Sequence, residues 1–131
     1  MTVQLGVLKV VALMLLAGGV VSACEKDQSD TTAIPQMAEA DSGHGKALMQ
    51  SYGCGSCHTV PGIAGATGLV GPPLTQFARR VYVAGMLRNT PDNLMNWLKD
   101  PQAIVPGNAM PNLGVTPRDA RDMAAYLYTI R

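Results

Sequence analysis

Aromatic side chains are scarce in this chain of 131 residues: they make up only 5% of it and include one Trp and one Phe. The length allows one small domain. Such a domain has little bulky apolar material for its core, and a bound apolar cofactor would supply the missing volume. Small domains rich in Gly or Met also fold without cofactors, so the composition indicates a prosthetic group without establishing one.

A strong charge of either sign is also lacking. The net charge is +1 and no basic run is present, so we expect no nucleic-acid partner. Residues 25–40 hold four acidic side chains against Lys26 alone, whereas residues 41–131 hold eight Lys and Arg against five Asp. This mildly basic balance is typical of a solvated surface; the alternative is a basic rim around a docking face for an acidic partner.

The hydrophobic run near the N-terminus is short. Residues 10–21 are apolar and uncharged and follow Lys9, whereas a membrane-spanning helix needs ~20 apolar residues. A positive charge, a short apolar stretch and then small residues are the pattern of a cleavable signal peptide. A spanning helix that begins at Val3, with the Lys9 side chain reaching back to the membrane surface, stays an alternative.

Only three cysteines are present, and the first closes this leader. Val21, Ser22, Ala23 and Cys24 resemble the lipobox of bacterial lipoproteins, in which the cysteine becomes the lipidated first residue of the mature chain. Two or more acyl chains on Cys24 would hold the protein stably on a membrane. We therefore expect a lipoprotein signal peptide over residues 1–23 and lipidation at Cys24; the alternative is a secretory signal that leaves a free thiol.

Residues 24–40 are expected to form the lipidated cysteine and a flexible linker. The stretch is polar, contains Pro35 and shows no sustained apolar period, which is typical of a coil with a span of roughly 20 Å. The folded domain would then comprise residues 41–131. We expect it to be exported and lipid-anchored, in the periplasm or on the outer side of the cytoplasmic membrane.

The other two cysteines belong to one short motif. Cys54, Gly55, Ser56, Cys57 and His58 form the Cys-x-x-Cys-His signature of c-type haem attachment. Two thiols at this spacing can form thioethers with two vinyl groups on one porphyrin edge, and the next residue brings an imidazole nitrogen to the iron. The motif predicts one covalent haem c, with the histidine as an axial ligand.

Three other interpretations of the motif fit these residues less well. A thioredoxin-like redox pair gives the adjoining histidine no role, and no βαβ pattern surrounds it. A zinc site needs a fourth ligand, for which only His44 and Cys24 remain, near a helix start and at the lipidation site respectively. A disulfide between Cys54 and Cys57 would be strained. Haem attachment is the interpretation that these residues favour.

The sixth iron ligand is a separate inference. Of eight methionines, six fall in the leader, the linker or helical patterns where Met usually fills a core, which leaves Met86 and Met110. Met110 stands in a loop between Pro106 and Pro111, far enough downstream to cross the opposite haem face. A thioether ligand favours ferrous iron and raises the reduction potential. We choose Met110, and expect His44, the only other histidine, to face solvent.

Residues 41–131 resemble class I cytochromes c. The likeness rests on residues 45–49, which lead into the haem motif, on residues 71–74 with the sequence Gly-Pro-Pro-Leu, and on residues 94–101 followed by 106–110, which are similar to the helix and methionine loop of the family. The nearest likeness is to cytochrome c domains of bacterial respiratory complexes, including those fused to oxidase subunits.

The resemblance also implies roles for individual residues. The carbonyl of Pro72 would accept the second N–H of the proximal histidine, which fixes its tautomer and raises its basicity. Trp97 would pack on the haem near the methionine. Arg79 or Arg80, together with Asn89, would bind the haem propionates.

The helical pattern agrees with an all-α fold, a small class I cytochrome c fold of three to five helices wrapped around one covalent haem. Asp41 or Ser42 can cap a first helix, and Thr90 and Thr116, each followed by Pro, can open two more. The last helix carries an apolar stripe made of Ala120, Met123, Ala124 and Leu127. Gly45 and Met49 offer it a partner, so we expect the N- and C-terminal helices to cross closely.

With both axial positions filled, the iron could bind no substrate, and the site would suit outer-sphere electron transfer. We therefore expect a monomeric electron carrier and not an enzyme. Its donor would be a quinol-oxidising complex or a dehydrogenase, and its acceptor a terminal oxidase or reductase. The alternatives are a haem enzyme or gas-binding protein with an open sixth site, and a permanent haem subunit of a respiratory oxidase or dehydrogenase complex.

Overall fold

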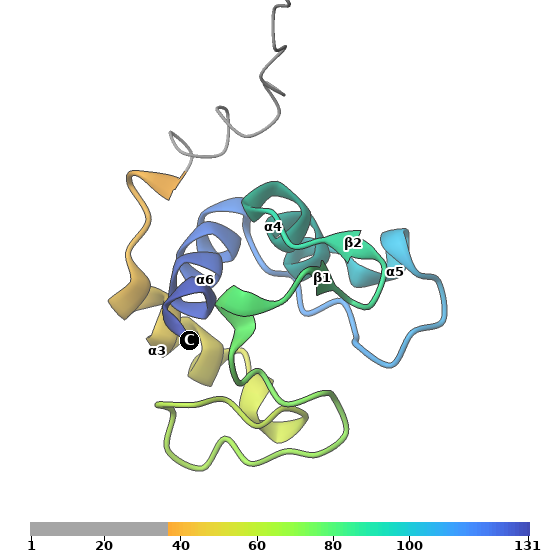
Figure 1. The fold of residues 1–131 in the computed structure, drawn as a ribbon. Helices are drawn as coiled ribbons and strands as arrows, with labels where there is room; N and C mark the ends of the chain where they lie inside the picture. Colours follow the sequence, from red (N-terminus) through yellow and green to blue (C-terminus); the bar gives the residue numbers. More distant parts are fainter. Residues whose placement is uncertain (1–36) are drawn as a thin grey trace, which may run out of the picture.

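The computed structural model describes residues 37–131. The predicted signal peptide, the predicted lipidation site Cys24 and most of the predicted linker lie outside the described residues. Within them the chain is mostly helical, as predicted, with one short two-stranded ribbon in addition (Figure 1). In chain order the elements are α3 (Ser42–Ser51), the 3-10 turns η2 (Cys54–Ser56) and η3 (Phe77–Arg79), β1 (Tyr82–Val83), β2 (Leu87–Arg88), α4 (Pro91–Lys99), α5 (Pro101–Ile104) and α6 (Pro117–Thr129).

The three predicted helix starts are present. The Asp41 carboxylate accepts a hydrogen bond from the backbone N–H of His44 at the start of α3. Thr90 and Thr116 cap α4 and α6 in the same way, and a proline takes the first helical position in each. These caps satisfy backbone N–H groups that the first turn of a helix leaves without a partner. The short α5, which begins directly after α4, was not predicted.

Helices α3 and α6 cross closely, as the sequence predicts (Figure 1). The crossing point is Gly45, where an added Cβ would lie only 1.9 Å from the carbonyl oxygen of Asp122. Here the absence of a side chain lets the two backbones meet. The buried faces of the two helices pack together, and they consist of Met49 on α3 and of Ala120, Met123, Ala124 and Leu127 on α6.

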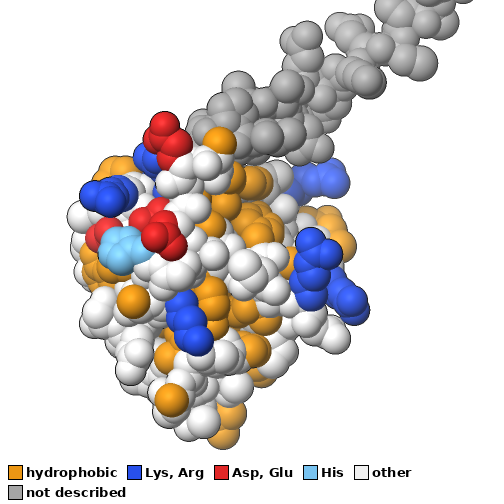
Figure 2. All heavy atoms as spheres, turned by 90° about the vertical axis from the view of Figure 1, so that its left-hand side faces the viewer, with side chains coloured by type: hydrophobic (Ala, Val, Ile, Leu, Met, Phe, Trp, Pro, Cys, Tyr) orange, Lys and Arg blue, Asp and Glu red, His pale blue; other side chains and the backbone are white. Residues whose placement is uncertain are grey.

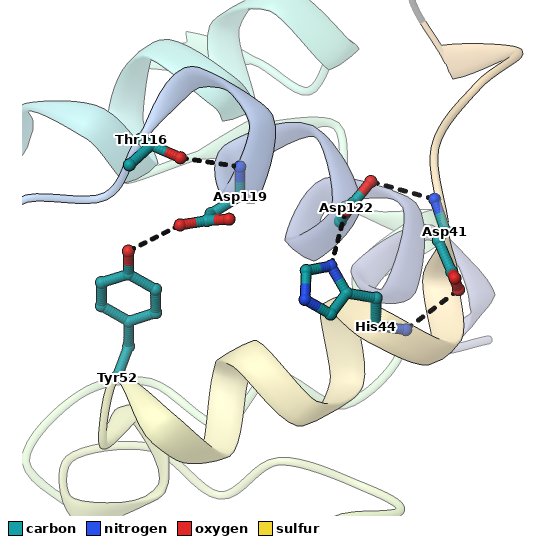
Figure 3. A network of polar contacts seen from close by, with 6 residues as sticks. All are labelled: Asp41, His44, Tyr52, Thr116, Asp119 and Asp122. Atoms are coloured by element: carbon teal, nitrogen blue, oxygen red, sulfur yellow. Dashed lines mark hydrogen bonds and ion pairs between the residues drawn. The ribbon is translucent and has the colours of Figure 1, made fainter.

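Two polar contacts tie α3 and its C-cap to α6 on either side of this crossing (Figure 3). The Tyr52 hydroxyl donates to Asp119 at 2.8 Å, and Nδ1 of His44 lies 2.8 Å from Oδ2 of Asp122. The Asp122 side chain is only 4% exposed and also accepts from the backbone N–H of Asp41. His44 is exposed, as expected, and its ring also contacts Asp122, which was not predicted. Its partner arrives from the far end of the chain, which local sequence could not show.

The remaining helices and loops surround this pair. Helix α4 packs on α6 through the buried Leu94 and Leu98. Residues 53–76 form a long loop at the lower end of the molecule in Figure 1, closed by a bridge between Thr59 and Thr67. A second loop, residues 105–116, leads from α5 into α6. No helix in residues 37–131 has the length and apolar character needed to cross a membrane.

The N-terminal end of the described part touches the domain. Met37 is half-buried and packs against the core. The Glu39 carboxylate lies 3.6 Å from Arg121 on α6. The last residues of the segment predicted as a linker therefore contact the folded domain.

Candidate functional site

The Cys-x-x-Cys-His motif forms a single tight turn at the end of α3. Gly53 adopts a left-handed conformation (φ 72°), which reverses the chain and starts η2. The Cys54 carbonyl then accepts hydrogen bonds from the backbone N–H groups of both Cys57 and His58, at 3.3 and 3.0 Å. Both thiols and the imidazole thus project from one hydrogen-bonded turn, which keeps their spacing fixed.

The two thiols are free and half-buried. Burial raises the pKa of the Cys54 thiol, so that it stays protonated at neutral pH. A thioredoxin-like pair requires the opposite shift, because its attacking species is a thiolate. Within residues 37–131 no three His, Cys, Asp or Glu side chains converge as a metal-ion cluster, so the zinc interpretation gains no support there.

The His58 ring is held in one orientation. Its Nδ1 lies 2.7 Å from the carbonyl oxygen of Pro72, the contact that the resemblance implied. Because a carbonyl can only accept, Nδ1 carries a proton, and in the neutral ring the lone pair is therefore on Nε2. A neutral imidazole with a free Nε2 and a hydrogen-bonded Nδ1 is the usual form of a metal-ligating histidine.

Two glycines fasten the Pro72 segment to the attachment turn. The Gly68 N–H donates to the carbonyl of Gly55 at 3.0 Å, and the Gly71 N–H donates to the carbonyl of Cys57 at 2.7 Å. A Cβ on Gly71 would lie 2.2 Å from Cε1 of His58, so only glycine lets the backbone pack on the ring. The positioning role of these glycines was not predicted, since it depends on contacts across the loop.

The methionine loop is built around two amide side chains. The Gln102 amide donates to the carbonyls of Asn108 and Met110, at 3.0 and 2.7 Å, and accepts from the Gly107 N–H. The Asn108 side chain accepts from the Met110 N–H at 2.8 Å. Met110 is therefore held through both its N–H and its carbonyl, with its side chain half-buried against the core. The hydrogen bond from the Met110 N–H to the Asn108 side chain, two residues earlier, is a common turn pattern that the sequence could have shown. The role of Gln102 could be identified only from the folded structure.

Comparison with known proteins identifies this arrangement. The sequence profile of the family described as Cytochrome c matches residues 42–131. The chain belongs to the cytochrome c family. The resemblance to class I cytochromes c and the small class I cytochrome c fold are thereby confirmed. A covalently attached haem c and a role in electron transfer come with this family.

The curated relatives of this cytochrome c are subunits of an oxidase. It is 31% identical to cytochrome c oxidase subunit 2 of Alkalihalophilus pseudofirmus over 116 residues, which are 83% of this chain and 33% of that protein. It is 36% identical to the subunit of the same name from Bacillus subtilis over 94 residues, which are 70% of this chain and 26% of that protein. The chain thus spans about a third of these relatives or less. No solved structure gave a significant match.

The donor set of this cytochrome c fits a haem. Two free thiols and an imidazole with an available Nε2 project from one turn. The thioether of Met110 comes from a separate loop that hydrogen bonds hold in place. Sulfur and imidazole are the usual protein ligands of haem in this class of protein. Met86, the other methionine considered, is 55% exposed and lies between β1 and β2. The assignment of Met110 as the sixth ligand stays a prediction.

The two arginines expected near the propionates differ in surroundings. The Arg80 guanidinium donates to the carbonyls of Pro73 and Thr75, and its Cζ lies 5.4 Å from the centre of the Phe77 ring. Arg79 is exposed, and its side chain makes no hydrogen bond or ion pair with other described residues. Propionate binding by either arginine stays a prediction.

Asn89 and Trp97 complete the set of predicted haem neighbours. The Asn89 amide donates to the carbonyls of Phe77 and Arg80, both at 3.0 Å, and its oxygen accepts from the Tyr128 hydroxyl. Burial raises the pKa of Tyr128 to about 12, so this hydroxyl keeps its proton. Asn89 thus holds η3 through its amide N–H groups and α6 through its amide oxygen, and propionate binding by it stays a prediction. Trp97 is half-buried against the core, and its packing on the haem likewise stays a prediction.

Proposed function

We propose that this cytochrome c carries a single haem c and passes single electrons between respiratory-chain partners while a lipid on Cys24 tethers it to the membrane. The observation that supports the proposal best is the fixed proximal imidazole: Nδ1 of His58 is 2.7 Å from the Pro72 carbonyl, which leaves Nε2 for the iron. The family match supports the electron-transfer role. The number of haems, the tether and the carrier role are our proposal.

In this proposal each residue of the site has a defined task. Cys54 and Cys57 would hold the porphyrin through thioethers, and His58 and Met110 would bind the iron. The bound haem supplies a ferric and ferrous couple, which accepts and returns one electron. With both ligands in place the iron would have no free position for a substrate, and we therefore propose that the protein is not an enzyme. The Pro72 carbonyl makes the proximal ring more basic and so tunes the potential.

The partners follow from the proposed role. The relatives are subunits of cytochrome c oxidase, and we therefore propose a terminal oxidase as the acceptor. A quinol-oxidising complex or a dehydrogenase would be the donor. The domain would lie on the outer side of the cytoplasmic membrane, where its tether confines its search to neighbouring complexes.

A test uses the full chain expressed together with a haem-ligation system. The mature protein should gain the mass of one haem and of the acyl chains on Cys24, and it should show a low-spin oxidised spectrum with a sulfur-to-iron charge-transfer band. Met110→Ala should abolish that band, and Met86→Ala should preserve it. An unchanged spectrum in Met110→Ala would refute the ligand assignment, and an unmodified polypeptide mass would refute haem attachment.

A second candidate function is a permanent haem subunit of a respiratory complex, and the names of the relatives favour it. The two candidates differ in how firmly the protein is bound. A permanent subunit would remain with its complex through purification in detergent at high salt. A mobile carrier would dissociate, because transient electron-transfer contacts are small and partly electrostatic.

A further inference from the structure

The attachment loop carries no charge. No Asp, Glu, Lys or Arg occurs between Lys46 and Arg79, a segment that contains the whole haem motif and the Pro72 turn. Figure 2 shows one face of the molecule, and the lower end of this face is white and orange, without the red or blue of charged side chains. The nearest charges border the loop: Lys46 on α3, and the Arg80 guanidinium at the carbonyls of Pro73 and Thr75.

Two adjacent apolar side chains stand on this uncharged loop. Leu69 is 85% exposed and Val70 is 75% exposed, more than any other large apolar residue among those described. They lie between Gly68 and Gly71, whose N–H groups are bonded to the attachment turn. Their backbone is therefore fixed before any partner arrives, which lowers the entropy cost of binding.

We infer that Leu69 and Val70 form the docking surface of this cytochrome c for a redox protein that presents an uncharged, apolar rim around its own cofactor. The inference rests on the proposed electron-transfer function and names its partner class. A charged partner patch would lose water over the loop itself, and an acidic one could pair only with Lys46 and Arg80 at its border. An apolar rim would cover the two side chains and gain their burial. The loop also belongs to the haem attachment site, so docking there brings the partner close to the redox centre.

The uncharged surface makes the encounter insensitive to salt. Electrostatically steered association slows steeply as ionic strength rises, whereas contact between apolar surfaces does not. A basic rim around the docking face, one of the two interpretations of the mildly basic composition, would predict a steep decline. The absence of Asp, Glu, Lys and Arg from residues 47–78, which include Leu69 and Val70, favours the weak dependence.

The test follows oxidation of the reduced, haem-loaded full chain in detergent micelles by respiratory membranes from a strain that lacks this protein. From about 20 mM to about 500 mM KCl, the second-order rate should change by less than about threefold. Leu69→Ser together with Val70→Ser should lower the rate about tenfold at both salt concentrations. Val81→Ser is the matched control, since Val81 is 64% exposed and follows Arg79 in the sequence, outside the uncharged segment. The rate of this variant should stay within about twofold of the native rate.

Several results would overturn the inference. A steep fall of the native rate with salt would show steering by charge, and a native rate in the double variant would show that the two side chains do not dock. An altered Soret band or reduction potential in the double variant would make them part of the haem pocket. If the double variant loses a binding to phosphatidylcholine vesicles that the native protein shows, the occupant of the surface is lipid. If it loses a dimer that the native protein forms in sedimentation, the occupant is a second copy of the chain.

The same experiment separates this inference from the proposed function. If the native protein carries haem but exchanges no electron with the membranes, the proposed function fails and the docking surface fails with it. If electron exchange is intact but the double variant is unaffected, only the docking surface fails.

Discussion

Gly71 shows how one missing side chain can control the orientation of the proximal ligand. Its backbone lies against the His58 ring, and its N–H is bonded to the Cys57 carbonyl. Its conformation is not left-handed, so the requirement for glycine is purely one of space. This separates the steric effect of a substitution from backbone strain.

We predict that Gly71→Ala displaces the His58 ring, because the new Cβ would lie 2.2 Å from Cε1. The displaced ring would lengthen its hydrogen bond to Pro72, and the reduction potential and the yield of haem-loaded protein should both change. Gly43→Ala is the control, since Gly43 lies in the first turn of α3 where a Cβ meets only the Asp41 carboxylate, at 3.2 Å. Potentiometry on both variants decides. Equal potentials in Gly71→Ala and the native protein would contradict the positioning role.

Asp122 is the buried acid of the described domain. Burial alone would raise its pKa, but the hydrogen bonds from His44 and the Asp41 N–H, and the charge of Arg118, outweigh burial and lower the pKa below its usual range. A carboxylate whose pKa is lowered by folding stabilises the fold above its unfolded pKa. That stabilisation is lost as the pH falls through the lower, folded pKa. The charged groups around His44 are Glu39, Arg118 and Arg121, besides the two aspartates.

We predict that Asp122→Asn lowers the free energy of unfolding at pH 7 by about 1–2 kcal/mol, which allows for the partial exposure of His44. The difference from the native protein should shrink as the pH falls below ~4. There the Asp122 carboxyl takes up a proton in the unfolded state first, and at still lower pH in the folded state as well. Urea unfolding of haem-loaded protein at several pH values measures it. Glu39→Gln is the control, because its exposed ion pair with Arg121 should contribute nothing measurable. A difference that stays constant down to pH 3 would contradict this linkage.

At the scale of single elements, the sequence predicts helix starts well and loop geometry poorly. Asp41, Thr90 and Thr116 could be identified because a cap and its helix are neighbours in the chain. The crossing at Gly45 could be predicted because a small residue faced an apolar stripe of matching period. The short β1–β2 ribbon had no such signal, since two-residue strands carry no apolar alternation.

The candidate site divides in the same way. The haem motif and the methionine loop have fixed spacing or bounding prolines, so they are legible in the sequence. Gln102 and Asn89 act through hydrogen bonds to backbone carbonyls, and Tyr128 donates to the side-chain oxygen of Asn89. The identity of these residues does not predict such contacts. The resemblance placed Asn89 near the site but could not show that its amide hydrogens clamp η3.

We predict that Gln102→Ala loosens the methionine loop without unfolding the domain. The substitution removes the hydrogen bonds that hold Gly107, Asn108 and Met110. On heating, the sulfur-to-iron band should therefore disappear well before helical circular dichroism is lost, whereas the two transitions coincide in the native protein. Gln50→Ala, on the exposed side of α3, is the control and should behave like the native protein. Coincident transitions in Gln102→Ala would show that the loop is held by other contacts.

At the scale of the whole molecule, the core of the described domain holds few aromatic side chains. Its buried residues include several Ala and Val, and among aromatics only Phe77 and Tyr126. The most extensive contact between two elements is that of α3 with α6, and the contact of α4 with α6 is smaller. Apolar burial is the main stabilising term in folding, and a domain of this size has little to spare. The haem would therefore have to contribute to the core as well as to the chemistry.

We predict that the chain with Cys54→Ala and Cys57→Ala, which cannot attach a haem covalently, loses most of its helical circular dichroism at 25 °C. Without the porphyrin, α4 and the loops would enclose a void, and cavities of that kind cost several kcal/mol, which is comparable to the whole stability of a small domain. Helices α3 and α6 should be the last to open, because the contact at Gly45 does not involve the loops. Hydrogen exchange should accordingly show residual protection confined to these two helices. A native-like spectrum in this variant would mean that the protein core is sufficient and that the haem serves electron transfer alone.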